Sequence, residues 1–180
     1  YTDDLVRGRQ TYAYFLRSPH AHAKIKKLDV SAAKSAPGVL AVFTGQDIAA
    51  AKMGSLICGW VVKDKHGKPH KAPAHPALAL DTVRHVGDQV AMVVAESIAE
   101  AKNAAEMIVV DYEELPSVVN PAKALDKGAP QVHGDVAGNL CYDWELGDKA
   151  AVDAAFAKAA NVAKLDIVNN RLIPNAMEPR

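Results

Sequence analysis

Histidines are the side chains of this 180-residue sequence best suited to metal binding or proton transfer. His20 and His22 are two residues apart, so on a strand both imidazoles would lie on one face and could share a metal ion. Pro19 precedes them and favours a turn, and the nearby sequence offers no third ligand at a usual spacing. The pattern therefore favours two ordinary polar side chains over a metal site.

A second group of basic side chains lies in one stretch of the sequence. Residues 53–76 are rich in glycine and proline and show little periodicity, which predicts a long surface loop. Its basic cluster could meet an anion or an acidic partner surface, although a solvated loop is the commoner outcome. The cluster contains His66, His70, His75, Lys63, Lys65, Lys68 and Lys71.

Other combinations of residues that often carry chemistry are poorly spaced here. Asp3-Asp4 and Glu113-Glu114 are adjacent pairs, so on strands their carboxylates would point to opposite faces and make poor acid/base pairs. Gly54 and Gly59 have phosphate-loop spacing, but Trp60 follows where a lysine is needed. No serine lies in a nucleophile elbow. The residues alone therefore identify no catalytic centre.

Composition limits the classes of partner. Lys plus Arg and Asp plus Glu each total 21, so no overall field attracts nucleic acid or an anionic membrane. The hydrophobic share of 49% is enough for a core, and no apolar run approaches the roughly 20 residues that cross a bilayer. Cys58 and Cys141 are far apart and predict two reduced core thiols, in keeping with a cytoplasmic location.

The element that must position the rest is the stretch 81–116, which predicts strand, helix and strand. Residues 90–95 form a continuous apolar run, typical of a strand covered on both faces. Ser97 and Glu100 have the spacing of a capping box at the start of a helix. From residue 108 the apolar period drops to two, which predicts a strand. The helix face expected on the sheet contains Ile98, Ala101, Ala105 and Ile108.

Weaker patterns predict the remaining elements. Before the central unit, strands are expected at 11–16, 22–28 and 39–43, and a further strand at 57–62 inside the loop. A helical turn is expected after Ser31, and a short helix at 48–52 that Thr44 and Asp47 would cap. After it, we expect a helical turn at 121–125, a strand at 140–146, a helix capped by Asp148, and a strand at 162–168. In that helix, Val152, Ala155, Phe156 and Ala159 would form one apolar face.

Several segments closely resemble one family in the same order along nearly the whole chain. They include R-S-P-H-A-H-A-K-I at 17–25, S-A-P-G-V-L-A-V-F-T-G-Q-D-I at 35–48, H-P-A-L-A-L-D-T-V-R-H-V-G-D-Q-V-A-M-V-V-A-E at 75–96 and V-D-Y-E-E-L-P at 110–116. These segments resemble the large, molybdenum-binding subunits of the xanthine oxidase and aerobic carbon monoxide dehydrogenase family. The last phrase, N-N-R-L-I-P-N-A-M-E-P-R, is most similar to large subunits of the carbon monoxide dehydrogenase type.

The resemblance implies an α+β (mixed α/β) fold in two parts. Residues 1–125 would form the family's α/β-hammerhead domain, 126–137 a linker, and 138–180 the opening segment of the molybdopterin-binding domain, a partial second α/β unit. The chain starts without Met, and we expect it to be part of a larger protein. Apolar residues of the second part would be left uncovered, so we also expect self-association of the fragment.

The resemblance further implies an oxidoreductase that uses molybdopterin, in bacteria usually as the cytosine dinucleotide, and takes oxygen from water. Partner subunits or domains would carry [2Fe–2S] clusters and FAD. The family's catalytic and cofactor-binding residues lie beyond Arg180, so no catalytic, cofactor-binding or metal-binding residue is assigned to this chain, and no role carries over to Glu178. Substrate remains open among carbon monoxide, purines, N-heterocycles and aldehydes. The alternative is a stand-alone protein-interaction module that uses the basic loop 63–75.

Overall fold

The structure is a computed structural model that describes residues 4–169 and 172. Contacts between Cα atoms divide the chain into two compact units. The first unit contains residues 9–143 and holds both sheets, and the second contains the described residues of 4–8 and those from Trp144 onward. Helices and strands occur together, which confirms the predicted α+β class. No helix among the described residues has the length and apolar character of a membrane span.

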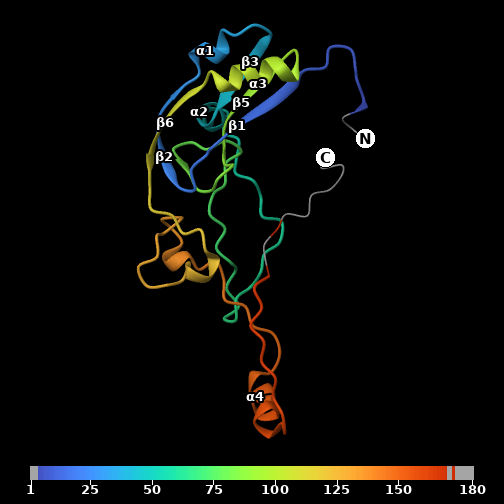
Figure 1. Ribbon diagram of the computed structural model, residues 1–180, viewed down its shortest axis with the longest axis vertical. Helices are drawn as coiled ribbons and strands as arrows, with labels where there is room; N and C mark the ends of the chain where they lie inside the picture. The colour runs from blue at the N-terminus through green and yellow to red at the C-terminus, as the bar shows by residue number, and fades with distance from the viewer. Residues whose placement is uncertain (1–3, 170–171, 173–180) are drawn as a thin grey trace. The chain divides into compact units, whose positions relative to one another are not determined.

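The first sheet is antiparallel, with strand order β1-β5-β3 (Figure 1). Its middle strand, β5 (Gln89–Ala95), lies between β1 (Tyr12–Arg17) and β3 (Val39–Thr44). The strand predicted from the apolar run at 90–95 is therefore confirmed and is central, although Met92 and Val94 are only half-buried. Its fully buried side chains are Val90, Ala91, Val93 and Ala95.

The second sheet is also antiparallel and has the order β4-β2-β6. It contains β4 (Thr82–Val83), β2 (Ala23–Asp29) and β6 (Val109–Glu114). The predicted alternation in β6 is confirmed, because Val110 and Tyr112 are half-buried while Asp111 and Glu113 are exposed. The two strands of the predicted strand–helix–strand unit, β5 and β6, belong to different sheets, so the helix between them links one sheet to the other.

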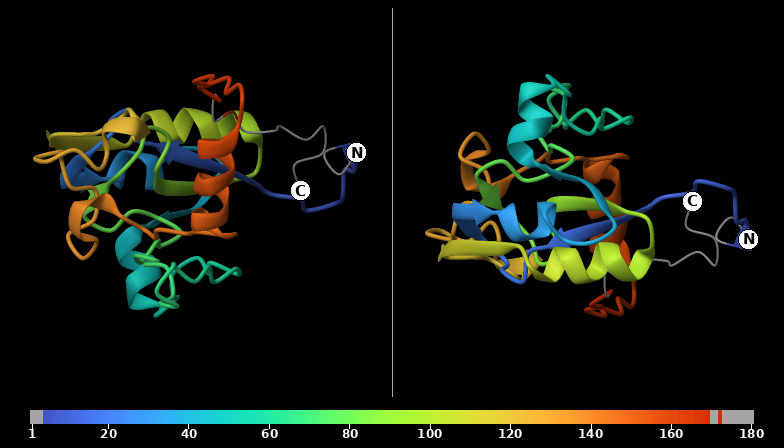
Figure 2. Two further views of the ribbon diagram at one scale, coloured as in Figure 1. Left: turned by 90° about the horizontal axis from the view of Figure 1, so that it is seen from below. Right: turned by 90° about the horizontal axis from the view of Figure 1, so that it is seen from above.

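Helix α3 (Ile98–Glu106) begins at the predicted cap. The amide of Glu100 donates to Ser97 Oγ at 3.2 Å, and Ser97 Oγ donates to Glu100 Oε2 at 2.7 Å. Figure 2 shows α3 lying along the first sheet, where small side chains permit close packing. The buried residues are Ala101, Ala104 and Ala105, followed by Ile108. The prediction was wrong for Ile98, which is 43% exposed because it lies in the first turn, beside the cap.

Two short helices flank β3. Helix α1 (Ser31–Lys34) precedes it, and α2 (Gly45–Ala50) follows directly. The predicted cap of α2 is confirmed, since both the amide and the hydroxyl of Thr44 donate to Asp47 Oδ2 at 2.7 Å. Gly45 is buried, and a Cβ there would lie 2.3 Å from the carbonyl oxygen of Ala79. The start of α2 therefore lies directly on the loop that leads into β4.

The long loop predicted at 53–76 is present, but the strand expected within it at 57–62 is not formed. Two isolated β-bridges, Ser55 to Pro76 and Lys63 to Pro69, and a few separate hydrogen bonds join its arms, but no continuous ladder forms. The facing arm contains Pro69, Pro73 and Pro76, which have no amide hydrogen to donate to a ladder. A continuous strand pair cannot form against such a partner.

The segment after β6 is held by turns. The predicted helical turn at 121–125 is confirmed as the 3₁₀ turn η2 (Pro121–Lys123), and η3 (Ala137–Asn139) follows. Asn139 fastens the segment, because its Oδ1 accepts from Val132 N at 2.9 Å and its Nδ2 donates to the carbonyls of Ala124 and Pro130. The strand predicted at 140–146 is wrong. Only single backbone bonds form there, from Lys71 N to Cys141 O and from Lys65 N to Asp143 O.

The second unit contains α4 (Lys149–Lys158). Its predicted cap is confirmed, since Asp148 Oδ1 accepts from Ala151 N at 2.9 Å. No residue of α4 is buried, and Val152 and Phe156 are each more than half exposed. The strand predicted at 162–168 is not formed, because no described segment pairs with it.

Candidate functional site

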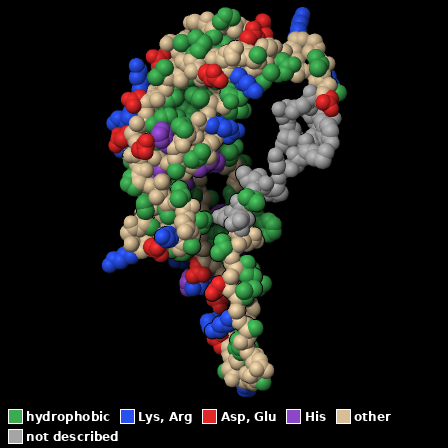
Figure 3. Space-filling view, viewed as in Figure 1, with side chains coloured by type: hydrophobic (Ala, Val, Ile, Leu, Met, Phe, Trp, Pro, Cys, Tyr) green, Lys and Arg blue, Asp and Glu red, His purple; other side chains and the backbone are tan. Residues whose placement is uncertain are grey.

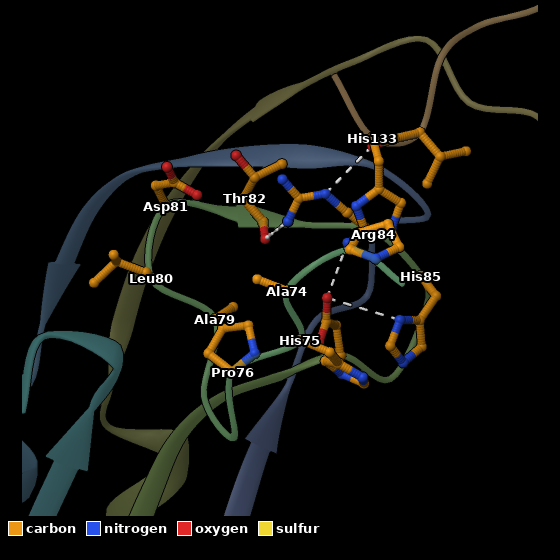
Figure 4. Close-up of a pocket in the computed structure, with 13 residues that line it drawn as sticks. Ala74, His75, Pro76, Ala79, Leu80, Asp81, Thr82, Arg84, His85 and His133 are labelled. Atoms are coloured by element: carbon orange, nitrogen blue, oxygen red, sulfur yellow. Dashed lines mark hydrogen bonds and ion pairs between the residues drawn. The ribbon is translucent and has the colours of Figure 1, made fainter. Parts of the chain in front are cut away.

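A cavity of about 460 Å³ in the first unit brings together polar side chains from distant parts of the sequence (Figure 4). Residues 73–76, 79–82, 84–85 and 132–133 line it, together with Asp88. Arg84, at the end of β4, lies among three histidines, His75, His85 and His133. We call this site the Arg84 cavity.

Arg84 joins the strand end to the segment after β6. Its Nη1 donates to the carbonyl of Thr82 at 3.3 Å, and its Nε donates to the carbonyl of Val132 at 3.3 Å. No carboxylate of the described residues forms an ion pair with this guanidinium. The half-buried positive charge is therefore held by neutral carbonyl groups alone.

Asp88 is a buried carboxylate on the wall of the same cavity. Its Oδ2 accepts from the amide of Arg84 at 2.9 Å and lies 3.7 Å from His85 Nδ1. Its own amide donates to the carbonyl of His85 at 3.1 Å, and its carbonyl accepts from Ser18 N at 2.8 Å. The turn 85–88 thus fixes the carboxylate in place.

His133 has an unusual electrostatic environment. Burial lowers the pKa of its imidazole below the ordinary value near 6.5, and the charge of Arg84 lowers it further. Asp135 acts in the opposite direction, while His22 and His75 add to the lowering. The neutral form of this imidazole is accordingly favoured more than in an ordinary histidine. The rings of His75 and His85 lie edge to face, with centroids 6.3 Å apart.

The two histidines considered for a metal site do not share a strand face. Strand β2 begins at Ala23, so both precede it in the turn that Pro19 indicated. His22 Nδ1 lies 2.9 Å from the carbonyl oxygen of Pro116, and His20 packs on Tyr112 with ring centroids 4.8 Å apart. In the part of the chain that the structure describes, no group of three or more His, Cys, Asp or Glu side chains is placed to hold a metal.

The basic loop is not a single cluster. His70 Nδ1 accepts from the amide of Val62 at 2.9 Å, whereas His75 lies on the Arg84 cavity. Lys65 Nζ pairs with Asp143 Oδ2 at 2.6 Å. Asp64 accepts from the amides of Lys68 and His66, and these hydrogen bonds, led by that of Lys68, lower the pKa of its carboxyl group. Part of the loop's positive charge is therefore compensated locally.

The paired acids behave as their spacing indicated. Glu113 pairs with Lys26 at 3.1 Å and Lys24 at 3.9 Å, whereas Glu114 lies 3.5 Å from His20 Nδ1. Asp3 lies outside the described residues. Glycines 54 and 59 lie in the open loop with no atom within 4 Å of a Cβ added to either, and they form no phosphate cradle.

The prediction that both cysteines are core thiols was wrong. Cys58 and Cys141 are free but exposed, because they lie on the long loop and on the irregular segment beside it. Sequence reasoning also missed the Arg84 cavity. Arg84 and His85 lie in the family-like segment 75–96 but form no catalytic or metal-binding motif with a neighbour, and only the folded chain brings His133 next to them.

Comparison with known proteins identifies the first part of the chain. The a/b hammerhead domain of aldehyde oxidase and xanthine dehydrogenase matches residues 1–116. The carbon monoxide dehydrogenase large chain of Afipia carboxidovorans is 35% identical over 191 residues, covering 99% of this chain and 22% of that protein. The xanthine dehydrogenase molybdenum-binding subunit of Escherichia coli is 36% identical over 140 residues, covering 78% and 18%.

The solved structures agree. The reconstituted CO dehydrogenase from Oligotropha carboxidovorans matches with a TM-score of 0.72 and 34% identity, covering 88% of this chain and 20% of that one. The chain thus spans about a fifth of the length of the relatives it matches. It belongs to the aldehyde oxidase and xanthine dehydrogenase family and contains that family's α/β-hammerhead domain.

Proposed function

We propose that this chain is an N-terminal scaffold region of a molybdenum-dependent oxidoreductase large subunit, of the carbon monoxide dehydrogenase type. The observation that carries the proposal is the alignment of 99% of the chain with about a fifth of a carbon monoxide dehydrogenase large chain. The resemblance noted in the sequence points the same way. As in the sequence-based assignment, the chain supplies no catalytic residue and is inactive alone.

The described residues do not fit a molybdopterin dinucleotide. A diphosphate needs clustered backbone amides, typically from a glycine-rich loop at a helix N-terminus. The Arg84 cavity has neither a glycine nor the N-terminus of a helix on its wall, so it offers no such cluster of amides. We therefore propose that other parts of the parent enzyme bind the cofactor, in its cytosine dinucleotide form.

Exposed apolar side chains support a scaffold role. Monomeric proteins rarely leave contiguous apolar patches uncovered, and such patches mark interaction surfaces. On the long loop, the exposed large side chains are Met53, Leu56, Ile57, Trp60 and Val61. We propose that the rest of the large subunit and the iron–sulfur and FAD subunits cover these surfaces in a cytoplasmic complex.

Tagging the chain's gene in its native cells tests this proposal. The purified protein should contain near-stoichiometric molybdenum, with iron and FAD in copurifying subunits, and the 180-residue chain expressed alone should contain none of these. A native protein without molybdenum or flavin would contradict the proposal. If such a protein also bound other polypeptides through loop 63–75, it would support the stand-alone interaction module instead.

A further inference from the structure

Four of the seven histidines of the chain gather around Arg84. His75, His85 and His133 line the Arg84 cavity itself. His22 lines an adjoining cavity of about 240 Å³, and Arg84 and His85 belong to the walls of both cavities. Figure 4 shows Arg84 and His133 close together, with His75 and His85 near each other. These side chains come from separate segments, so the grouping is a product of the fold.

The guanidinium keeps donors free for a ligand. An arginine side chain has five N–H donors, and Arg84 uses those of Nε and one of Nη1 on the carbonyls of Val132 and Thr82. Its other N–H groups have no acceptor among the described residues. The two bonds also fix the orientation of the planar group, which is the condition for directional binding of an oxyanion.

The charge of the cavity depends on its histidines. With neutral imidazoles, the carboxylates of Asp81 and Asp88 outweigh the single charge of Arg84. Asp88 is buried, and its carboxylate accepts a hydrogen bond from the amide of Arg84 and lies near His85. It is therefore not free to pair with the guanidinium group of Arg84. Protonation of His75, His85 and His133 reverses the balance and makes the cavity strongly positive. Asp135 is the further acid that acts on His133.

We propose that the Arg84 cavity is a binding site for a small oxyanion, of the sulfate, phosphate or carboxylate class, that fills when its histidines are protonated. The cavity volume of about 460 Å³ lies within the range of small-molecule sites and exceeds what a bare inorganic ion needs. A compact organic phosphate or carboxylate therefore also fits. The site is independent of the scaffold role proposed above.

Sulfate is the probe of choice, because its charge stays constant over the pH range in which histidine titrates. Histidine ring resonances of the 180-residue chain are followed by NMR during a sodium sulfate titration, with sodium chloride at matched ionic strength as control. We expect saturable shifts of the His133 and His85 rings at about pH 5.5, and binding weaker by about tenfold or more at about pH 8.

Substitutions test the assigned residues. His133→Gln and His85→Gln should each weaken sulfate binding several-fold, whereas His66→Gln on the exposed tip of the long loop should leave it unchanged. Arg84→Lys should weaken sulfate binding because it removes the directional N–H donors. If this variant also unfolds the chain, the two histidine variants still test whether the cavity binds sulfate. Three results would each overturn the proposal. Chloride could reproduce the resonance shifts, sulfate could bind with equal affinity at both pH values, or both cavity histidine variants could bind sulfate as the unchanged chain does.

Discussion

The environment of His133 has a consequence for stability. Burial and the neighbouring charge of Arg84 lower its pKa in the folded state below the ordinary value near 6.5. As pH falls through that value, the unfolded chain therefore takes up a proton that the folded chain does not, and the free energy of unfolding decreases. Well above pH 6.5 the imidazole is neutral in both the folded and the unfolded chain, so this effect on stability vanishes.

We therefore predict that His133→Gln flattens the loss of stability between about pH 7 and pH 5. Urea melts at several pH values measure this, with chloride as the only added anion so that no oxyanion is present to bind the cavity. His66→Gln is the matched control, because that side chain lies on an exposed loop. A wild-type His133 resonance that titrates above pH 6.5 would contradict the predicted direction.

The cap of α3 gives a second prediction at the level of one residue. Ser97→Ala removes the acceptor for the amide of Glu100 and leaves the Glu100 carboxylate without its hydroxyl donor. The expected loss is about 1 kcal/mol in the free energy of unfolding. Asn103→Ala on the exposed face of the same helix should be neutral or stabilise by up to roughly 0.6 kcal/mol. Equal losses in denaturant melts would mean that the cap does not stabilise α3.

These residues also show which interactions a sequence reveals. The three helix caps, at Thr44, Ser97 and Asp148, were predictable because each capping side chain and the group that it hydrogen-bonds are only three residues apart in the sequence. Arg84 and His133 were not, because their proximity depends on the turns at 121–139 that fold back on the end of β4.

At the level of elements, the junction of β3 and α2 depends on one close approach. A methyl group at Gly45 would meet the carbonyl of Ala79 at 2.3 Å, and backbone on both sides would have to move. We predict that Gly45→Ala lowers the free energy of unfolding by roughly 1–3 kcal/mol. Gly54→Ala is the control, since nothing lies within 4 Å of its added Cβ, and it should be neutral or slightly stabilising. Comparable thermal shifts for both variants would contradict this account.

Predicted strands formed only where another segment of the chain could pair with them in a sheet. The predicted strands at 11–16, 22–28 and 39–43 formed because each pairs with a neighbour and covers a buried face. The apolar runs at 57–62, 140–146 and 162–168 have similar composition but no continuous ladder partner among the described residues. Periodicity reports which face is apolar, whereas pairing depends on segments far away in the sequence.

At the scale of the whole molecule, the charged and apolar surfaces differ in character. Charged side chains of both signs are interspersed on the face shown in Figure 3, as the balanced composition predicts. Large apolar side chains, by contrast, are exposed in both compact units. The domain boundary expected near residue 125 stays a prediction. Residues 126–143 nevertheless belong to the first compact unit, where Val136 is buried and Val132 accepts from Arg84.

The second unit has the more exposed apolar surface. In α4, Val152 and Phe156 are 51% and 59% exposed, and Leu165 and Ile167 in the following segment are 81% and 76% exposed. Full burial of each large side chain would contribute roughly 1.5–3 kcal/mol. The backbone at 162–168 pairs with no strand among the described residues, which leaves donors and acceptors for another chain. Together these groups favour association with another chain.

We therefore predict that the 180-residue chain self-associates and that a chain ending at Asp143 is a folded monomer, because the cut keeps the first compact unit whole. Light scattering after size-exclusion chromatography measures both masses, and circular dichroism reports folding of the shorter chain. The double variant Val152→Ser, Phe156→Ser should reduce association of the full chain, while Lys164→Ser, an exposed polar change, should not. A monomeric full chain together with an unfolded shorter chain would show that the residues after Asp143 stabilise the first unit rather than drive association.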